Sequence, residues 1–158
     1  MLNQAREYVH IMTPYLILDE EMKQALMMAA RRGVEVVLIL PHIPDKPYAF
    51  ALAKAHYRQL LEAGVQIYEF TPGFVHAKEF VSDGKRAVVG TINLDYRSLY
   101  HHFECACYME EMDVVFDIEE DMQKTMELSH RITMEDVRSQ GIFTRAAGIF
   151  LKLVAPLL

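Results

Sequence analysis

The sequence predicts an α/β fold built on a mixed, largely parallel β-sheet. Strand-like apolar runs alternate with amphipathic helical patterns through residues 7–70, which is typical of strands joined by crossover helices. The run at residues 34–40 is apolar throughout, as in a strand buried on both faces. A chain of 158 residues is long enough to bury one core, so we expect residues 1–158 to form a single domain.

Local signals place each element of the first half. Asp19 is expected to cap a helix with two acids in its first turn, and Gly33 is expected to end it. Pro47 is expected to open a second helix that Gly64 ends. In that helix His56 has charged neighbours on both sides, so we expect it on a solvated face. The expected strands of this half are residues 7–12, 34–40 and 65–70.

The second half is expected to open with a hairpin of two short strands that turns at Gly84. A turn at residues 93–98 follows. The tail, 142–158, is apolar apart from two charges, and we expect it to dock as a C-terminal helix, the alternative being a dimer or membrane contact. The remaining expected elements are a strand at 102–109, a helix at 118–129 and a helix that begins at Thr133.

Composition limits the classes of function. A formal net charge of −6 argues against a nucleic-acid partner, which usually requires a basic stripe. No run approaches the roughly 18 apolar residues that cross a bilayer, and no signal peptide is evident, so we expect a soluble chain. Cys105 and Cys107 are too close for a mutual disulfide. We expect both to be small buried strand residues rather than metal ligands beside His101 and His102.

The segment from His76 to Asn93 carries the chemistry. His76 and Lys78 are two residues apart in a strand-like run, so they are predicted to share a face. A neutral imidazole can attack phosphorus and form a covalent phosphohistidine. An ammonium and a carboxamide can hold the non-bridging oxygens, where charge builds in the transition state. Such a reaction needs no metal ligand set, and we expect neither a metal nor a cofactor.

The pattern resembles the signature of the phospholipase D superfamily, H-x-K-x4-D-x6-G-S-x-N, with Thr91 where the family usually has serine. The flanking segments T-P-Y at 13–15, A-A-R-R-G-V at 29–34 and N-L-D-Y-R-S at 93–98 resemble the C-terminal catalytic half of bacterial cardiolipin synthases. The resemblance implies a phospholipase D-like three-layer αβα sandwich. It also implies catalytic roles for His76, Lys78, Asp83, Asn93 and Glu104.

The same resemblance implies supporting roles. An acid at the position of Glu104 would hydrogen-bond the catalytic histidine and fix its tautomer. Asp83 often serves the structure near the hairpin in this family. Substrate contacts are implied for Thr91, Arg97, Ser98 and Tyr15.

The family's mechanism uses two signatures that face each other, and this chain contains one. Our leading hypothesis is the C-terminal half of a cardiolipin synthase-like enzyme, which transfers a phosphatidyl group between two phosphatidylglycerols at the bacterial cell membrane. Its partners would be an anionic phospholipid, the membrane surface through the full-length enzyme, and a second signature-bearing half or a second copy. The first strand begins within ten residues, which suits a fragment of a longer chain.

Two other classes of function stay open. One is a homodimeric phosphodiesterase, nuclease-like or lipase-like, which would pair two His76 residues about a two-fold axis. The other is a non-catalytic lipid-binding module.

Overall fold

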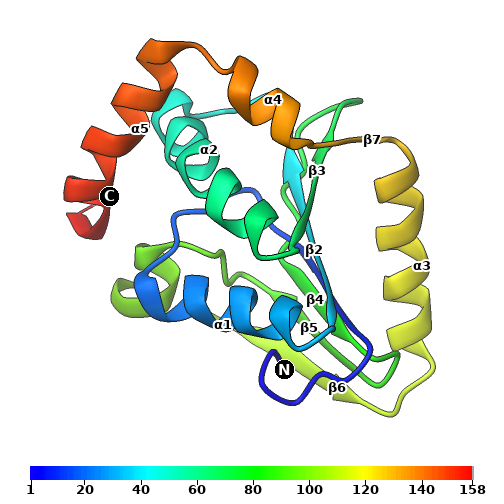
Figure 1. The fold of residues 1–158 in the computed structure, drawn as a ribbon. Helices are drawn as coiled ribbons and strands as arrows, with labels where there is room; N and C mark the ends of the chain where they lie inside the picture. Colours follow the sequence, from blue (N-terminus) through cyan, green and yellow to red (C-terminus); the bar gives the residue numbers. More distant parts are fainter. Residues whose placement is uncertain (158) are drawn as a thin grey trace.

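The computed structural model describes residues 1–157, without the side chains of 142–145 and 149, and folds as a sheet between helices (Figure 1). The strands are β1 (Tyr8–Met12), β2 (Glu35–Pro41), β3 (Gln66–Phe70), β4 (Glu79–Ser82), β5 (Arg86–Gly90), β6 (Ala106–Glu110) and β7 (Ser129–Arg131). The helices are α1 (Glu20–Arg31), α2 (Pro47–Glu62), α3 (Val114–Glu127), α4 (Met134–Ser139) and α5 (Ile142–Val154), with a short π-helix η1 (Arg97–His101) and a 3-10 turn η2 (Ala155–Leu157).

The seven strands form one mixed sheet in the order β6-β5-β4-β1-β2-β3-β7. β2 pairs in parallel with both β1 and β3, and the other four pairings are antiparallel. The predicted α/β fold with a mixed sheet is confirmed. Its parallel part is limited to β1, β2 and β3. No α-helix lies between β3 and β4, β4 and β5, or β5 and β6, whereas α3 carries the chain from β6 at one edge of the sheet to β7 at the other.

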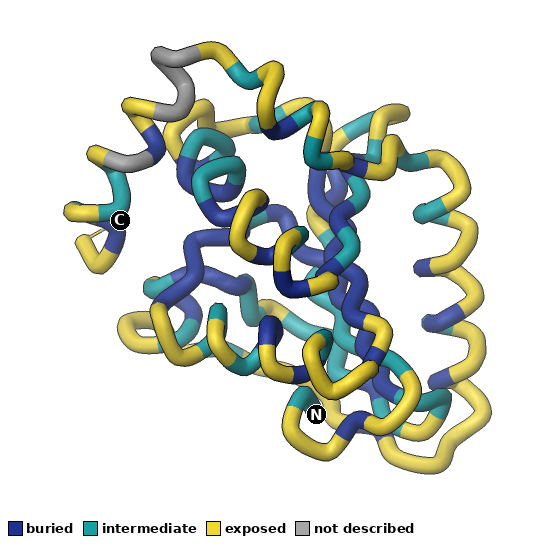
Figure 2. Tube along the Cα trace, viewed as in Figure 1, coloured by how far each residue is buried: buried dark blue, intermediate teal, exposed yellow. Residues whose placement is uncertain are grey.

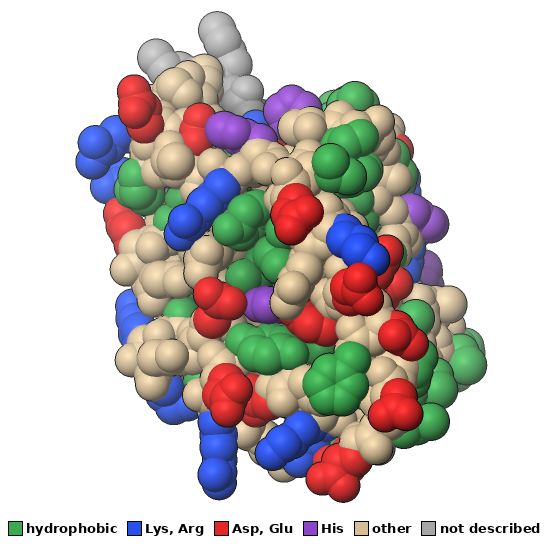
Figure 3. Space-filling view, turned by 90° about the vertical axis from the view of Figure 1, so that its right-hand side faces the viewer, with side chains coloured by type: hydrophobic (Ala, Val, Ile, Leu, Met, Phe, Trp, Pro, Cys, Tyr) green, Lys and Arg blue, Asp and Glu red, His purple; other side chains and the backbone are tan. Residues whose placement is uncertain are grey.

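Both faces of the central sheet are covered. In β2, Val36 and Leu38 belong to the core cluster beneath α1 and α2, whereas Val37 and Ile39 belong to the cluster beneath α3. A strand covered on both faces was predicted from its continuous apolar run, and this prediction is confirmed. Figure 2 shows the buried stripe of α3 turned toward the sheet. On the outer face of this layer, acidic and hydrophobic side chains are interspersed (Figure 3).

The predicted helix boundaries of the first half are also confirmed. The side chain of Asp19 accepts a hydrogen bond of 2.7 Å from the N–H of Met22 and caps α1. Pro47 occupies the first turn of α2. Gly33 and Gly64 follow the two helices with φ of 91° and 97°, a conformation that glycine adopts without steric cost.

Several boundaries of the second half differ from the prediction. β4 begins at Glu79 and β6 at Ala106, each later than predicted, while α3 begins four residues earlier, at Val114. Ser129 does not end that helix but opens β7, which pairs with the end of β3 through Phe70. This seventh strand depends on a partner far away in the sequence, so no local pattern indicates it.

The C-terminal segment docks on α2, as predicted for the part that the structure describes. A Cβ on Gly148 would lie 2.7 Å from the carbonyl oxygen of Ala51, so the two helices approach closely. Lys152 donates to the carbonyl of Ala55 over 2.9 Å. The predicted solvated face for His56 is wrong: His56 is buried, and burial together with nearby lysines lowers its pKa to about 3. Within residues 1–157 no helix has the length and apolar character needed to cross a bilayer.

Candidate functional site

His76, Lys78, Gly90 and Asn93 belong to segments at one end of the hairpin, where β4 begins and β5 ends. His76 and Lys78 lie in the extended segment before β4 rather than inside a strand, which corrects the predicted strand boundary. The N–H of Gly90 donates to the carbonyl of Lys78 over 3.2 Å and closes the hairpin at this end. The lysine and the glycine of the signature are therefore neighbours across the sheet.

Gly90 ends β5 and pairs with Ala106, the first residue of the antiparallel strand β6. A Cβ at this position would lie 2.3 Å from the carbonyl oxygen of Cys105 and 2.5 Å from the Cα of Ala106. Both contacts are with backbone, which cannot move aside as a flexible side chain can. Next to it, the N–H of Thr91 donates to the carbonyl of Cys105 over 3.0 Å. The glycine thus permits the close approach that brings Glu104 beside the signature.

Thr91 and Glu104 form a hydrogen-bonded pair beside this end of the β5–β6 pairing. The Thr91 hydroxyl donates to the Glu104 carboxylate and accepts from the N–H of Cys105 at 3.0 Å. Hydrogen bonds from Thr91 and from Ser98 lower the pKa of Glu104, and the charges of His102 and Lys78 act in the same direction. Glu104 is therefore a carboxylate held in place at the edge of the site.

The Lys78 side chain is a cation whose hydrogen-bond acceptor in this structure is a neutral backbone carbonyl. Its ammonium donates to the carbonyl of His76 over 2.7 Å. Partial burial lowers the pKa of Lys78, while the negative charges of Asp95 and Glu104 oppose that shift. An anion that enters the site could replace the neutral carbonyl as hydrogen-bond acceptor, because a charged acceptor binds an ammonium more strongly.

Asn93 is fixed by its backbone, and its side-chain oxygen lacks a hydrogen-bond partner among the described residues. Its N–H donates to the hydroxyl of Ser98 over 3.1 Å, and the N–H of Ser98 donates to Asp95 over 2.8 Å. The buried carboxamide oxygen of Asn93 has no hydrogen-bond partner among the described residues. Rotation of the carboxamide by 180° exchanges this oxygen with the amide N–H₂, so the side chain can present either a donor or an acceptor.

The imidazole of His76 is exposed and lies against Phe74, with ring centroids 5.7 Å apart. The structure does not contain the predicted bond from Glu104 to this histidine: the described contacts of Glu104 are with Thr91, Ser98 and His102. Glu104 instead holds the hydroxyl of Thr91 in place.

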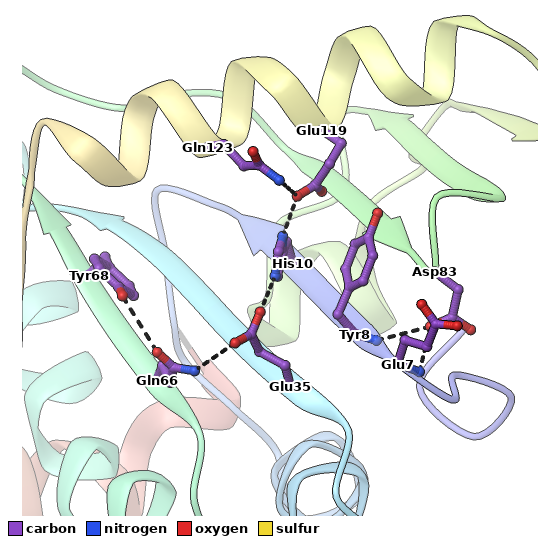
Figure 4. A network of polar contacts seen from close by, with 9 residues as sticks. All are labelled: Glu7, Tyr8, His10, Glu35, Gln66, Tyr68, Asp83, Glu119 and Gln123. Atoms are coloured by element: carbon purple, nitrogen blue, oxygen red, sulfur yellow. Dashed lines mark hydrogen bonds and ion pairs between the residues drawn. The ribbon is translucent and has the colours of Figure 1, made fainter.

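Asp83 lies at the opposite end of β4. About five extended residues, or roughly 17 Å, separate it from Lys78. Its carboxylate accepts hydrogen bonds from the N–H groups of Arg6, Glu7 and Tyr8 at 2.9–3.3 Å, two of which Figure 4 shows. Partial burial opposes the shift, but these three donors lower the pKa of Asp83. The geometry gives Asp83 a structural task, in line with the role near the hairpin that the resemblance implied, and its catalytic role stays a prediction.

Asp83 also makes the turn. It has a φ of 56°, and the following Gly84 has a φ of 61°. The N–H of Lys85 closes this turn on the carbonyl of Ser82 over 3.0 Å. Consecutive positive φ angles suit a type I′ hairpin, for which Asp-Gly is a favoured pair.

The residues predicted to bind substrate separate into two groups. Thr91 and Ser98 hydrogen-bond to Glu104, and Ser98 also accepts the N–H of Asn93, so both residues position other groups of the site. Ser98 is itself buried. Tyr15 and Arg97 line a separate cavity beside the site. Sequence reasoning did not single out the buried Asp95, which receives the Ser98 N–H.

The predicted burial of the two cysteines is wrong. Cys105 and Cys107 are both exposed free thiols. Cys105 precedes β6 and Cys107 is its second residue, and β6 is an edge strand that has β5 on one side and no strand on the other. Alternating small residues indicate a strand, but they do not reveal whether that strand lies inside a sheet or at its edge.

Comparison with known proteins gives consistent results. A family model described as cardiolipin synthase, PLD-like domain, matches residues 1–126. A cardiolipin synthase from Clostridium perfringens is 35% identical over all 158 residues, which span 33% of that protein. One from Halalkalibacterium halodurans is 34% identical over the same residues, which span 31% of it. A Streptococcus mutans protein described as uncharacterized is 61% identical, with 34% of its length covered. The chain thus spans about a third of the length of the curated relatives it matches.

Solved structures support the fold. Nuc, a phospholipase D family member from Salmonella typhimurium, has a TM-score of 0.71 at 17% identity, with 83% of this chain and 85% of that chain covered. A phosphatidylserine synthase from Haemophilus influenzae has a TM-score of 0.68 at 16% identity, with 99% of this chain and 43% of that chain covered. The expected phospholipase D-like αβα sandwich is therefore confirmed.

Proposed function

The chain belongs to the cardiolipin synthase, PLD-like domain family, and from this premise we propose that it is the C-terminal catalytic half of a phosphatidyltransferase that makes cardiolipin. One observation carries the proposal. At one end of the sheet, the ammonium of Lys78, the unpartnered carboxamide oxygen of Asn93 and the exposed ring of His76 belong to segments that the hairpin joins. These three groups are the ones that nucleophilic attack at a phosphodiester requires.

The reaction has two steps. In the first, an imidazole nitrogen attacks the phosphorus of phosphatidylglycerol; a P–N bond forms, the P–O bond to glycerol breaks, and a second imidazole gives the leaving glycerol its proton. In the second, the hydroxyl of another phosphatidylglycerol attacks that phosphorus. The new P–O bond forms, the P–N bond breaks, and the hydroxyl proton goes to the second imidazole. His76 supplies one imidazole of this pair.

The other groups bind the reacting phosphate. Lys78 leaves the carbonyl of His76 and donates to a non-bridging oxygen, and the Asn93 amide donates to another. The second imidazole comes from a second signature, carried by another half of the same protein. The length of the cardiolipin synthases, about three times that of this chain, supports this arrangement. Since the substrates are bilayer lipids, the complete enzyme works at the cell membrane.

The test uses the native protein that carries these residues and vesicles of phosphatidylglycerol. We expect cardiolipin and free glycerol in equal amounts, and a phosphatidyl adduct on the peptide that contains His76 after an alkaline quench. Formation of phosphatidic acid without cardiolipin would support a phosphodiesterase instead. Vesicle binding without any product would support a lipid-binding module and contradict the proposal.

A substitution at Asp83 separates structure from chemistry. Asp83→Ala leaves three N–H groups without their acceptor and places alanine at a positive φ. We expect a loss of about 2 kcal/mol in the free energy of unfolding. Because the carboxylate lies far from Lys78, we also expect kcat below the unfolding temperature to stay within about threefold. A catalytic role would instead lower kcat by orders of magnitude.

A further inference from the structure

The helix α5 and the turn η2 that follows it have an apolar face that the fold leaves uncovered. α5 lies on the outer side of α2, away from the sheet (Figure 1). Its inner face meets α2 at Gly148, and Ala155 is buried on the same side. The outer face carries exposed residues at the spacing i, i+4, i+7 and i+11: Ala146, Phe150, Leu153 and Leu157. The last three are 66%, 78% and 82% exposed.

The dimensions of α5 suit a helix that lies on a bilayer rather than one that crosses it. α5 has 13 residues, so its length is about 20 Å, whereas the hydrocarbon core of a bilayer is about 30 Å thick. A helix with one apolar face can lie in the plane of the membrane and bury that face at the boundary of headgroups and acyl chains. Exposed apolar stripes of this kind mark interaction surfaces.

The charges of the α5 segment fit an anionic surface. Residues 137–158 contain Arg138, Arg145 and Lys152 and no acidic residue, in a chain whose formal net charge is −6. Lys152 is already bound to the carbonyl of Ala55, so the segment favours an anionic surface mainly because it brings no carboxylate to it. The basic, acid-free composition distinguishes this segment from the acidic chain around it.

Three acids on the neighbouring helices are paired or lie away from α5. Glu20 at the start of α1 contacts Lys23 at 2.6 Å, and Glu62 at the end of α2 contacts Arg58 at 2.9 Å. The exposed Glu135 lies in the first turn of α4, not in the turn that leads into α5. A negatively charged bilayer would therefore meet little repulsion along the outer face of α5.

The apolar face adjoins the signature. The carbonyl oxygen of Pro156, in η2, lies 3.3 Å from the Nε2 atom of His101, at the end of η1. Ala155 belongs to a hydrophobic cluster against which Tyr96 packs, and Tyr96 lies in the turn that follows Asn93. A bilayer in contact with α5 would therefore lie beside the phosphate-binding end of the hairpin.

We propose that the outer face of α5 lies in the interface of an anionic phospholipid bilayer and brings the signature to its lipid substrates. The inference rests on the proposed function, because it assigns the surface by which that site reaches a bilayer. Phe150, Leu153 and Leu157 enter the boundary of headgroups and acyl chains, while the opposite face of the helix stays docked on α2. The acid-free segment and the adjoining lipid-binding site favour a bilayer over a protein partner.

The first test identifies what covers the stripe. The native protein is mixed with phosphatidylglycerol vesicles that contain a phospholipid with a photoactivatable acyl chain, illuminated and digested with trypsin. We expect lipid adducts on the peptides that begin at Ala146 and at Leu153. Phe116 is the control: it is 63% exposed but lies against the turn at Gly84, at the other end of the hairpin, and should carry no adduct.

The second test measures the consequence for catalysis. The double variant Phe150→Ser and Leu153→Ser removes the centre of the stripe without changing a charge. We expect cardiolipin formation on phosphatidylglycerol vesicles to fall about tenfold or more. Turnover of a short-chain phosphatidylglycerol that dissolves as monomers should stay within about twofold, because no bilayer has to be reached. Phe116→Ser is the matched control and should leave both rates unchanged.

The outcomes separate the possible occupants of the face. Absence of lipid adducts from both peptides refutes the proposal, and so does an equal loss of turnover on vesicles and on monomers. A change of molecular mass in the double variant, measured by light scattering and without lipid adducts, would assign the face to a protein partner and also refute it. Failure of the proposed function is distinct, since the unmodified protein would then make no cardiolipin, whereas the lipid adducts form without turnover.

Discussion

His76→Ala is expected to abolish cardiolipin formation, with a loss of about 10⁴-fold or more in kcat. The side chain supplies either the nucleophile or the proton-transfer group of the imidazole pair, and neither Lys78 nor Asn93 can take over that role. The loss corresponds to more than about 5 kcal/mol of transition-state stabilisation. Thin-layer or mass-spectrometric analysis of lipids from phosphatidylglycerol vesicles measures it directly.

The control for this substitution is another exposed histidine outside the site. His130 lies on β7, at the far edge of the sheet from the strands that carry the signature, and its side chain is 3.5 Å from Asp136. His130→Ala should leave cardiolipin formation within about twofold, because exposed ion pairs contribute little to stability. Residual turnover above about one per cent in His76→Ala would contradict the assigned role. Vesicle binding by both variants should equal that of the unmodified protein, since neither substitution removes a lysine or an arginine.

The parts of the site that the sequence predicts are those set by spacing along the chain. The hairpin brings Lys78 next to Gly90 because the residues between them form two short strands and a turn. The cap at Asp19 and the helix stop at Gly33 are likewise local, and both are confirmed. The sequence alone predicts a structural feature when the residues that determine it lie within a few positions of each other along the chain.

The parts that it does not predict depend on distant partners. Glu104 contacts Thr91 rather than His76 because the segment that leads into β6 packs closely against Gly90 at the end of β5, an approach that residue spacing does not reveal. The charged neighbours of His56 in the sequence predict a solvated face of α2. His56 is buried because α5, which lies far along the chain, covers that face. In each case the deciding contact comes from an element far along the chain.

A buried polar network beneath α3 provides a further example and the basis of the last prediction (Figure 4). The ring of His10 contacts Glu119 at 2.7 Å through Nδ1 and Glu35 at 3.1 Å through Nε2. The side chains of His10 and Glu119 are only 5% and 8% exposed. Gln123 donates to the same Glu119 oxygen at 2.9 Å. This network joins β1 to α3 through the buried pair of His10 and Glu119, and β1 to β2 through Glu35, whose side chain is exposed.

The network makes stability depend on pH. Burial favours the neutral ring, but the bonds and charges of Glu119 and Glu35 outweigh it and raise the pKa of His10. A group whose pKa is higher in the folded state stabilises the fold fully below its unfolded pKa, about 6.5 for histidine. That contribution is lost as the pH rises through the raised folded value. We therefore expect His10 to make the protein more stable at pH 6 than at pH 9.

Glu119→Gln is expected to lower the free energy of unfolding by about 3 kcal/mol at pH 6, because it leaves a buried ring without its charged partner. The same substitution should reduce the pH dependence between 6 and 9, and urea titrations at several pH values measure both effects. His56 contributes in the opposite sense, since its pKa is lowered to about 3, but it is common to both proteins and cancels in their difference. Glu120→Gln on the exposed side of α3 is the matched control and should change stability by less than about 0.5 kcal/mol. If the two variants lose the same small amount, the network does not hold α3 against the sheet.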